Sequence, residues 1–150
     1  MSKSGKGWAI AGASLAALTA VYLAWSNRRL FTVNDITTGE STAYPEIRSR
    51  VHYAEVPHVL TAAEQALRRL PGWKLLVLDS ENDAIEAEAR VAGLFASDVT
   101  VYVVSLGHGQ TRVTIRSRSR LGGGDWGRNA AHIRLLQRAM DDRLNTEAAF

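Results

Sequence analysis

The sequence of 150 residues contains no cysteine. The chain therefore has no disulfide framework, no thiolate metal site and no cysteine nucleophile. It also lacks the motifs of a nucleophile elbow, a phosphate-binding P-loop and a zinc-binding H-E-x-x-H helix. These absences exclude several enzyme classes. They leave the compartment open, because many exported domains also lack disulfides.

The composition is that of a folded domain, with 46% hydrophobic and 22% charged residues. The formal net charge is +3, yet residues 7–27 carry no charge at all. Four basic residues flank this stretch: Lys3, Lys6, Arg28 and Arg29. Residues 31–150 have a net charge of −1. The basic excess thus belongs to the N-terminal segment, and we expect no nucleic-acid partner.

Residues 7–27 predict a transmembrane helix. At 1.5 Å per residue, 21 residues span about 31 Å, close to the hydrocarbon thickness of a bilayer. Tryptophans stand near both ends, and small residues recur about every four positions, which lets another helix approach closely. We predict an anchor over residues 1–29 whose partners are the lipid bilayer and a membrane protein. The anchor residues are Trp8, Gly12, Ala16, Ala20 and Trp25.

A cleaved signal peptide is the competing interpretation, since Ala24-Trp25-Ser26 has small residues at both cleavage positions. The apolar stretch is longer than a usual signal core, which favours an uncleaved signal-anchor. With the amino terminus counted, the N-terminal flank is slightly more positive than the other. The positive-inside rule then favours a body outside the cytoplasm, which is the periplasm if the source is a Gram-negative bacterium.

The rest of the chain predicts an α+β domain. A linker or extended segment at 30–46 leads into the domain at 47–145, and 146–150 form a tail. The order β-α-β-β-β-β-α indicates an antiparallel sheet of four to five strands with two helices packed on one face. Alternation and helical spacing predict strands at 47–53, 73–78, 84–91, 99–104 and 111–121, and helices at 57–70 and 125–144.

The most unusual stretch is TRVTIRSRSR at residues 111–120. In a strand its arginines share one face, while residues 79–98 are rich in acid. One interpretation is a ladder of cross-strand ion pairs. The other is an anion site for a lipid head group or small metabolite, because the row runs into a glycine loop at a helix start. The anion-binding candidates are Arg116, Arg118, Arg120, Asp125, Arg128 and Asn129.

Asp125 is also predicted to cap the following helix, which counts against the anion site.

Catalytic groups are sparse. The four histidines, at 52, 58, 108 and 132, have no metal-ligand spacing and are expected to be solvated or capping. Glu86 and Glu88 share a strand face that we expect to be solvated. We therefore expect no catalytic residue, metal or cofactor, and activity as an enzyme is the less favoured interpretation.

Several of these residues carry a family resemblance. Residues 116–120, followed by Gly122, Asp125, Gly127, Asn129 and Ile133, resemble the signature RSRSRxGxxDxGxNxxRI of the domain-of-unknown-function family 1499. Four further stretches match the same pattern in the same order: 34–38, 44–45, 72–73 and 85–87. The resemblance covers roughly residues 33–144. It implies a membrane-associated, often exported domain and no established activity.

Two functions are consistent with these features. The favoured one is a membrane-anchored, non-enzymatic accessory domain, a protein-interaction subunit of a membrane assembly. The alternative is a binding module for an anionic lipid or small metabolite at the arginine strand and glycine loop.

Overall fold

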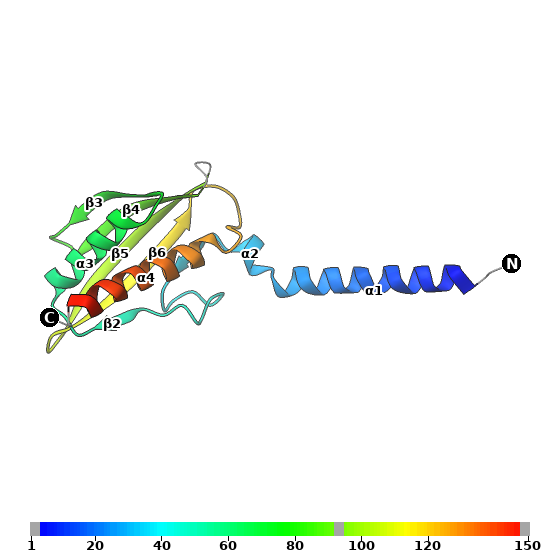
Figure 1. Cartoon of the computed structure of the whole chain (residues 1–150), viewed down its shortest axis with the longest axis horizontal. Helices are drawn as coiled ribbons and strands as arrows, with labels where there is room; N and C mark the ends of the chain where they lie inside the picture. Colours follow the sequence, from blue (N-terminus) through cyan, green and yellow to red (C-terminus); the bar gives the residue numbers. More distant parts are fainter. Residues whose placement is uncertain (1–3, 92–94, 148–150) are drawn as a thin grey trace.

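A 23-residue helix, α1 (Ser4–Ser26), projects away from the rest of the chain (Figure 1). The computed structural model describes residues 4–91 and 95–147. Every side chain from residue 15 to residue 26 is exposed. Within the described ranges, no helix combines the length and the apolar character needed to cross a membrane. The predicted single-pass span is not supported by this finding and stays a prediction.

The body is a single antiparallel sheet with two helices on one face (Figure 1). A short helix, α2 (Arg29–Thr32), connects α1 to it. The strands are β1 (Asp35–Thr37), β2 (Arg50–His52), β3 (Trp73–Asp79), β4 (Ala84–Val91), β5 (Phe95–Gly107) and β6 (Gln110–Ser119), and the covering helices are α3 (Val56–Arg69) and α4 (Arg128–Glu147). The strand order is β1-β6-β5-β4-β3, and β2 also pairs with β6. The predicted α+β architecture is confirmed.

The sheet has six strands, one or two more than expected. The additional strand, β1, lies in the segment predicted as a linker or extended segment, where Ile36 pairs with Ser117 of β6. Three residues are too short to show alternation in the sequence. Ile36 is fully buried, so its contribution to the core fixes β1 at the edge of β6.

The core lies between the sheet and the helices α3 and α4. Alternate residues of β4, β5 and β6 point toward the helices, so Ile85, Val101 and Ile115 are fully buried. Leu67 of α3 and Ile133 of α4 fill the facing layer and are also fully buried. Burying each such aliphatic side chain contributes about 1.5–3 kcal/mol. The two helices therefore fix the curvature and position of β6, which carries the arginines.

None of the described helices covers the opposite face of the sheet (Figure 1). We call this side the open face. Arg112, Arg116 and Arg118 of β6 alternate with the buried Val113 and Ile115, which places the arginines on it. The sequence alternation predicted this division correctly.

Candidate functional site

Ion pairs occupy two arginines of the open face. Arg116 donates two hydrogen bonds to Asp35 of β1, from Nε to Oδ1 at 3.0 Å and from Nη2 to Oδ2 at 2.5 Å. These bonds, more than any other contact, hold the pKa of Asp35 below its ordinary value. Arg120 donates to Asp98 of β5, with Nε 2.9 Å from Oδ1. The predicted ladder of ion pairs is therefore present on this face.

Glu88 of β4 lies at the centre of a second group. It receives hydrogen bonds from Arg90 on its own strand and from Arg120, which reaches across β5. The side chains above it leave Glu88 only 6% exposed, so the expectation of a solvated position was wrong for this residue. The bond from Arg90 lowers the pKa of Glu88, against the raising effect of desolvation. Glu86, two residues earlier, is exposed as expected.

Arg118 differs from its neighbours. It lies in register between Asp35 and Asp98, but within the described residues it makes no hydrogen bond or ion pair closer than 4 Å. Its side chain is exposed. Arg128, at the start of α4, instead stacks its guanidinium over the ring of Phe95 at 4.2 Å from the centroid. Apart from Arg118, the predicted anion-binding residues thus have separate local partners, and anion binding by them stays a prediction.

Asp125 and Asn129 form the core of a buried polar network. Both are fully buried. Asp125 accepts from the backbone N–H of Gly127 at 2.8 Å and of Asn129 at 2.7 Å, so its side chain binds amides at the start of α4. Because α4 begins at Arg128, Gly127 and not Asp125 stands directly before the helix. The Asn129 side chain accepts from Ser117 at 2.8 Å and donates to Ser119 at 3.2 Å and to the carbonyl of Asn34 at 2.7 Å. These two side chains therefore hold β1, β6 and α4 together.

The glycine loop forms hydrogen bonds with the segment that leads from α1 into the body. We call residues 122–127 the clasp, because they hold residues 30–34. Three hydrogen bonds make this contact: Asn34 Nδ2 to the Gly122 carbonyl at 2.7 Å, Asp125 N to the Val33 carbonyl at 3.1 Å, and Trp126 N to the Leu30 carbonyl at 2.8 Å. A Cβ on Gly124 would lie 2.2 Å from the Phe31 carbonyl carbon, so only glycine permits this approach.

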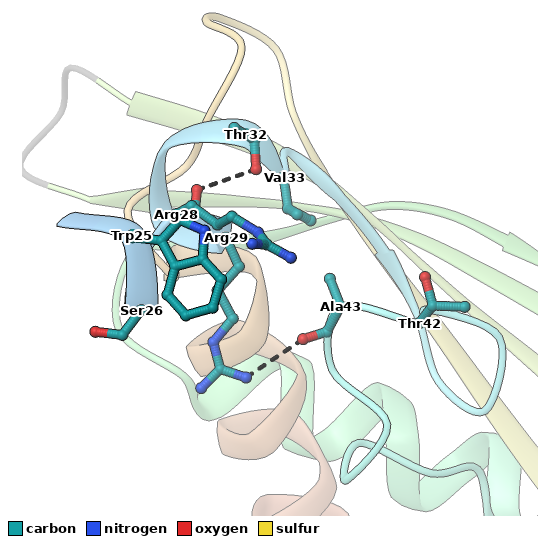
Figure 2. A pocket seen from close by; sticks show the side chains of 8 residues that line it. All are labelled: Trp25, Ser26, Arg28, Arg29, Thr32, Val33, Thr42 and Ala43. Carbon is teal, nitrogen blue, oxygen red and sulfur yellow. Dashed lines mark hydrogen bonds between the residues drawn. The ribbon is translucent and has the colours of Figure 1, made fainter. Parts of the chain in front are cut away.

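A cavity of about 500 Å³ opens where α1 meets the body (Figure 2). We call it the elbow pocket. Its lining includes Trp25, Ser26, Arg28, Arg29, Thr42 and Ala43. Arg29 donates from Nη1 to the Ala43 carbonyl at 3.3 Å and lies over the Tyr44 ring, 4.7 Å from its centroid. The sequence pattern identifies the two arginines only as flanking charges, because nothing in a local pattern places Thr42 and Ala43 beside them.

The predicted anchor residues lie along α1. Ala16, Ala20 and Trp25 are exposed, and Trp25 also lines the elbow pocket. Trp8 and Gly12 lie in the part of α1 for which the structure describes the backbone only.

Two histidines depart from the solvated interpretation. His132 of α4 is only 7% exposed and packs its ring edge-on to Trp73, with centroids 5.4 Å apart. Burial, and then the charge of Arg128, lower its pKa. Burial also lowers the pKa of His52, although Asp141 opposes this. Among the described side chains, no group of three or more histidines and carboxylates is arranged to hold a metal ion.

The covered antiparallel sheet defines the body as a helix-on-sheet α+β protein. The chain belongs to the family described as "Protein of unknown function (DUF1499)", whose model matches residues 27–140. The predicted family resemblance is confirmed. A search of the curated proteins finds no match.

The body is similar to solved structures at low sequence identity. Norcoclaurine synthase from Thalictrum flavum, solved with dopamine and hydroxybenzaldehyde, is 11% identical, with a TM-score of 0.51 over 82% of this chain and 90% of that one. CalU16 from Micromonospora echinospora is 14% identical, with a TM-score of 0.40 over 67% and 83% of the two chains. At these identities the similarity to the synthase shows the fold alone.

Proposed function

We propose that this protein is a membrane-anchored, non-enzymatic accessory domain that serves as an interaction subunit of a membrane assembly. The observation that carries the proposal is the bare apolar surface of α1. Leu15, Leu18, Val21 and Leu23 are between 53% and 68% exposed. Contiguous apolar surface of this kind marks contact with a membrane or another protein.

One polar group within this part of α1, the hydroxyl of Thr19, is compatible with an apolar environment. Thr19 donates from Oγ1 to the Leu15 carbonyl at 2.8 Å, so its hydroxyl needs no water. The uncharged stretch 7–27 has the length of a bilayer core, and the slight positive excess before it favours a body outside the cytoplasm. We therefore propose a bilayer as the environment of α1.

The proposed protein partner contacts the small-residue side of the same helix. Ala16 and Ala20 are exposed and four positions apart, which places them on one face of α1. A face of small residues allows a neighbouring helix to approach closely within a membrane. The alternative, a binding module for an anionic lipid or metabolite at the arginine strand, retains Arg118 as its exposed, unpaired candidate.

Membrane fractionation of the full chain tests the anchor. We expect the protein to stay in the membrane pellet after a carbonate wash and to be released by mild detergent. Leu18→Arg combined with Val21→Arg should move it to the wash, because each charge near the centre of a span costs about 3 kcal/mol. Leu76→Arg, at an exposed leucine of β3, is the matched control and should stay in the pellet. Release of the unaltered protein by carbonate would overturn the anchor.

A separate experiment tests the partner. The full chain in mild detergent should run as a complex with a second chain. Ala16→Leu with Ala20→Leu should leave the protein in the membrane but remove that chain, because the side chains hold the helices apart. A lone monomer in the unaltered protein would overturn the role as a subunit.

A further inference from the structure

The elbow pocket combines a cavity with positive charge and hydroxyl groups. Figure 2 shows the guanidinium groups of Arg28 and Arg29 on the side of the pocket that faces Ala43. Thr42 adds a hydroxyl group to the lining, whereas the hydroxyls of Ser26 and Thr32 already donate to the carbonyls of Leu23 and Arg28. A planar guanidinium with hydroxyl neighbours is the arrangement that recognises phosphate oxygens.

The charge of Arg28 is not neutralised by the chain. Its guanidinium lies 5.3 Å from the centroid of the Trp25 ring, and no carboxylate of the described residues lies within 4 Å of it. Arg29 has one carboxylate nearby, that of Glu46, at 3.9 Å. Glu46 is held more closely by Arg134, at 2.8 Å. Arg29 and Arg134 therefore share one carboxylate, Arg28 has none within 4 Å among the described residues, and the pocket keeps an excess of positive charge.

The end of α1 opposes an anion only in part. A helix C-terminus is a site of partial negative charge because its last carbonyls lack partners. In this protein the Leu23 carbonyl accepts from the backbone and side chain of Asn27, at 3.0 and 2.8 Å, and from Ser26 Oγ at 3.2 Å, and the Trp25 carbonyl accepts from the backbone of Arg28 at 3.3 Å. These donors compensate part of the negative charge beside the pocket.

The position of the pocket suggests the source of the anion. It begins at Trp25, near the end of the uncharged stretch 7–27, where a spanning helix would emerge at the level of the lipid head groups. We propose that the elbow pocket binds a phosphate group, with Arg28 as its principal ligand, and that an anionic phospholipid supplies it. This inference rests on the proposed membrane anchor.

Binding to the full chain in uncharged detergent tests the inference without requiring a bilayer. The ligands are short-chain phosphatidylglycerol, short-chain phosphatidylcholine, glycerol phosphate and inorganic phosphate, each titrated by calorimetry. We expect saturable binding of phosphatidylglycerol only. Arg28→Gln should weaken it about tenfold, the loss of one charge-assisted contact.

Arg112→Gln is the matched control, because Arg112 is an exposed arginine of the open face that makes no ion pair within the described residues. It should leave the affinity within about twofold. Arg28-dependent binding of inorganic phosphate or glycerol phosphate as tight as that of the lipid would support the phosphate site and overturn the lipid as its source. No binding by any ligand, or equal loss in both variants, would overturn the site. Carbonate fractionation reports on the anchor independently, so the two failures are distinguishable.

Discussion

Two polar residues near the glycine loop, Asp125 and Asn129, stabilise the fold through hydrogen bonds. Asn129 makes three side-chain hydrogen bonds: the two to β6 are buried, and the one to the residue before β1 is partly buried. Asp125 uses both carboxylate oxygens on backbone amides. Both belong to the stretch that carries the family resemblance. In this protein, that stretch is explained by the cohesion of the sheet with α4.

Replacing Asn129 should therefore destabilise the body. Asn129→Ala leaves Ser117, Ser119 and the Asn34 carbonyl without this partner, which should cost about 2–3 kcal/mol of unfolding free energy. Urea denaturation followed by circular dichroism measures the effect. Asn145→Ala, at an exposed position of α4, is the control and should change the free energy by less than about 0.5 kcal/mol. Equal effects of both variants would contradict the buried network.

Burial of His132 predicts a dependence of stability on pH. Because its pKa is lowered in the folded chain, the unfolded chain binds more protons as the pH falls below about 6.5. Stability is then fully present above this pH and is lost as the pH falls toward the lower folded pKa. The midpoint of urea unfolding should be lower at pH 5.5 than at pH 7.5.

His132→Phe should reduce this drop, because it removes the titrating ring while keeping an aromatic edge against Trp73. His52, whose pKa is also lowered, accounts for part of the remainder. The control is His108→Asn, at an exposed turn position with φ of 54°, which asparagine adopts readily. An unchanged drop in the phenylalanine variant would show that His132 does not titrate on unfolding.

At the scale of the element, the clasp fixes the chain segment that follows α1 to the body. Hydrogen-bonded turns run from the end of α1 through residues 27 and 28 into α2, and the clasp then fixes residues 30–34. The rings of Phe31 and Trp126 add an edge-on contact, with centroids 4.6 Å apart. The backbone amides of Asp125 and Trp126 donate to the carbonyls of Val33 and Leu30. These two amides are therefore not free to bind an anion.

Two neighbouring glycines separate this role from general loop flexibility. Gly124→Ala should displace α2, since the added Cβ would meet the Phe31 backbone at 2.2 Å. Gly123→Ala is the control, because its Cβ would meet nothing within 4 Å. Hydrogen exchange should accelerate at the amides of Asp125 and Trp126 in the first variant only. Matched exchange in both variants would mean that the clasp tolerates a side chain at position 124.

The long elements were predictable from the sequence, and the short elements α2 and β1 were not. Alternation identified β4 and β6, and helical spacing identified α3, because each is long enough to show its period. α2 and β1 span four and three residues and are fixed by contacts with a loop and a strand far along the chain. For the same reason the arginine face was predicted, while Asp35, the partner of Arg116, was not.

At the scale of the whole molecule, we expect the stability of the body not to depend on α1. The exposed side chains of residues 15–26 contribute little to the core. A chain that begins at Arg28 should therefore fold with a thermal midpoint within about 3 °C of the full chain, a change of less than about 1 kcal/mol. Circular dichroism melting in the same detergent measures this. A much lower midpoint would show that α1 supports the body.

The clasp also has a geometric consequence. Residues 30–34, which follow α1, are hydrogen-bonded to the loop beside β6 and are thereby held against the sheet. A neighbouring helix that turns α1 about its long axis would swing the open face, with its arginines, around the same axis. If α1 lies in a bilayer, as proposed, a partner helix in the bilayer would set the direction in which that face points beside the membrane.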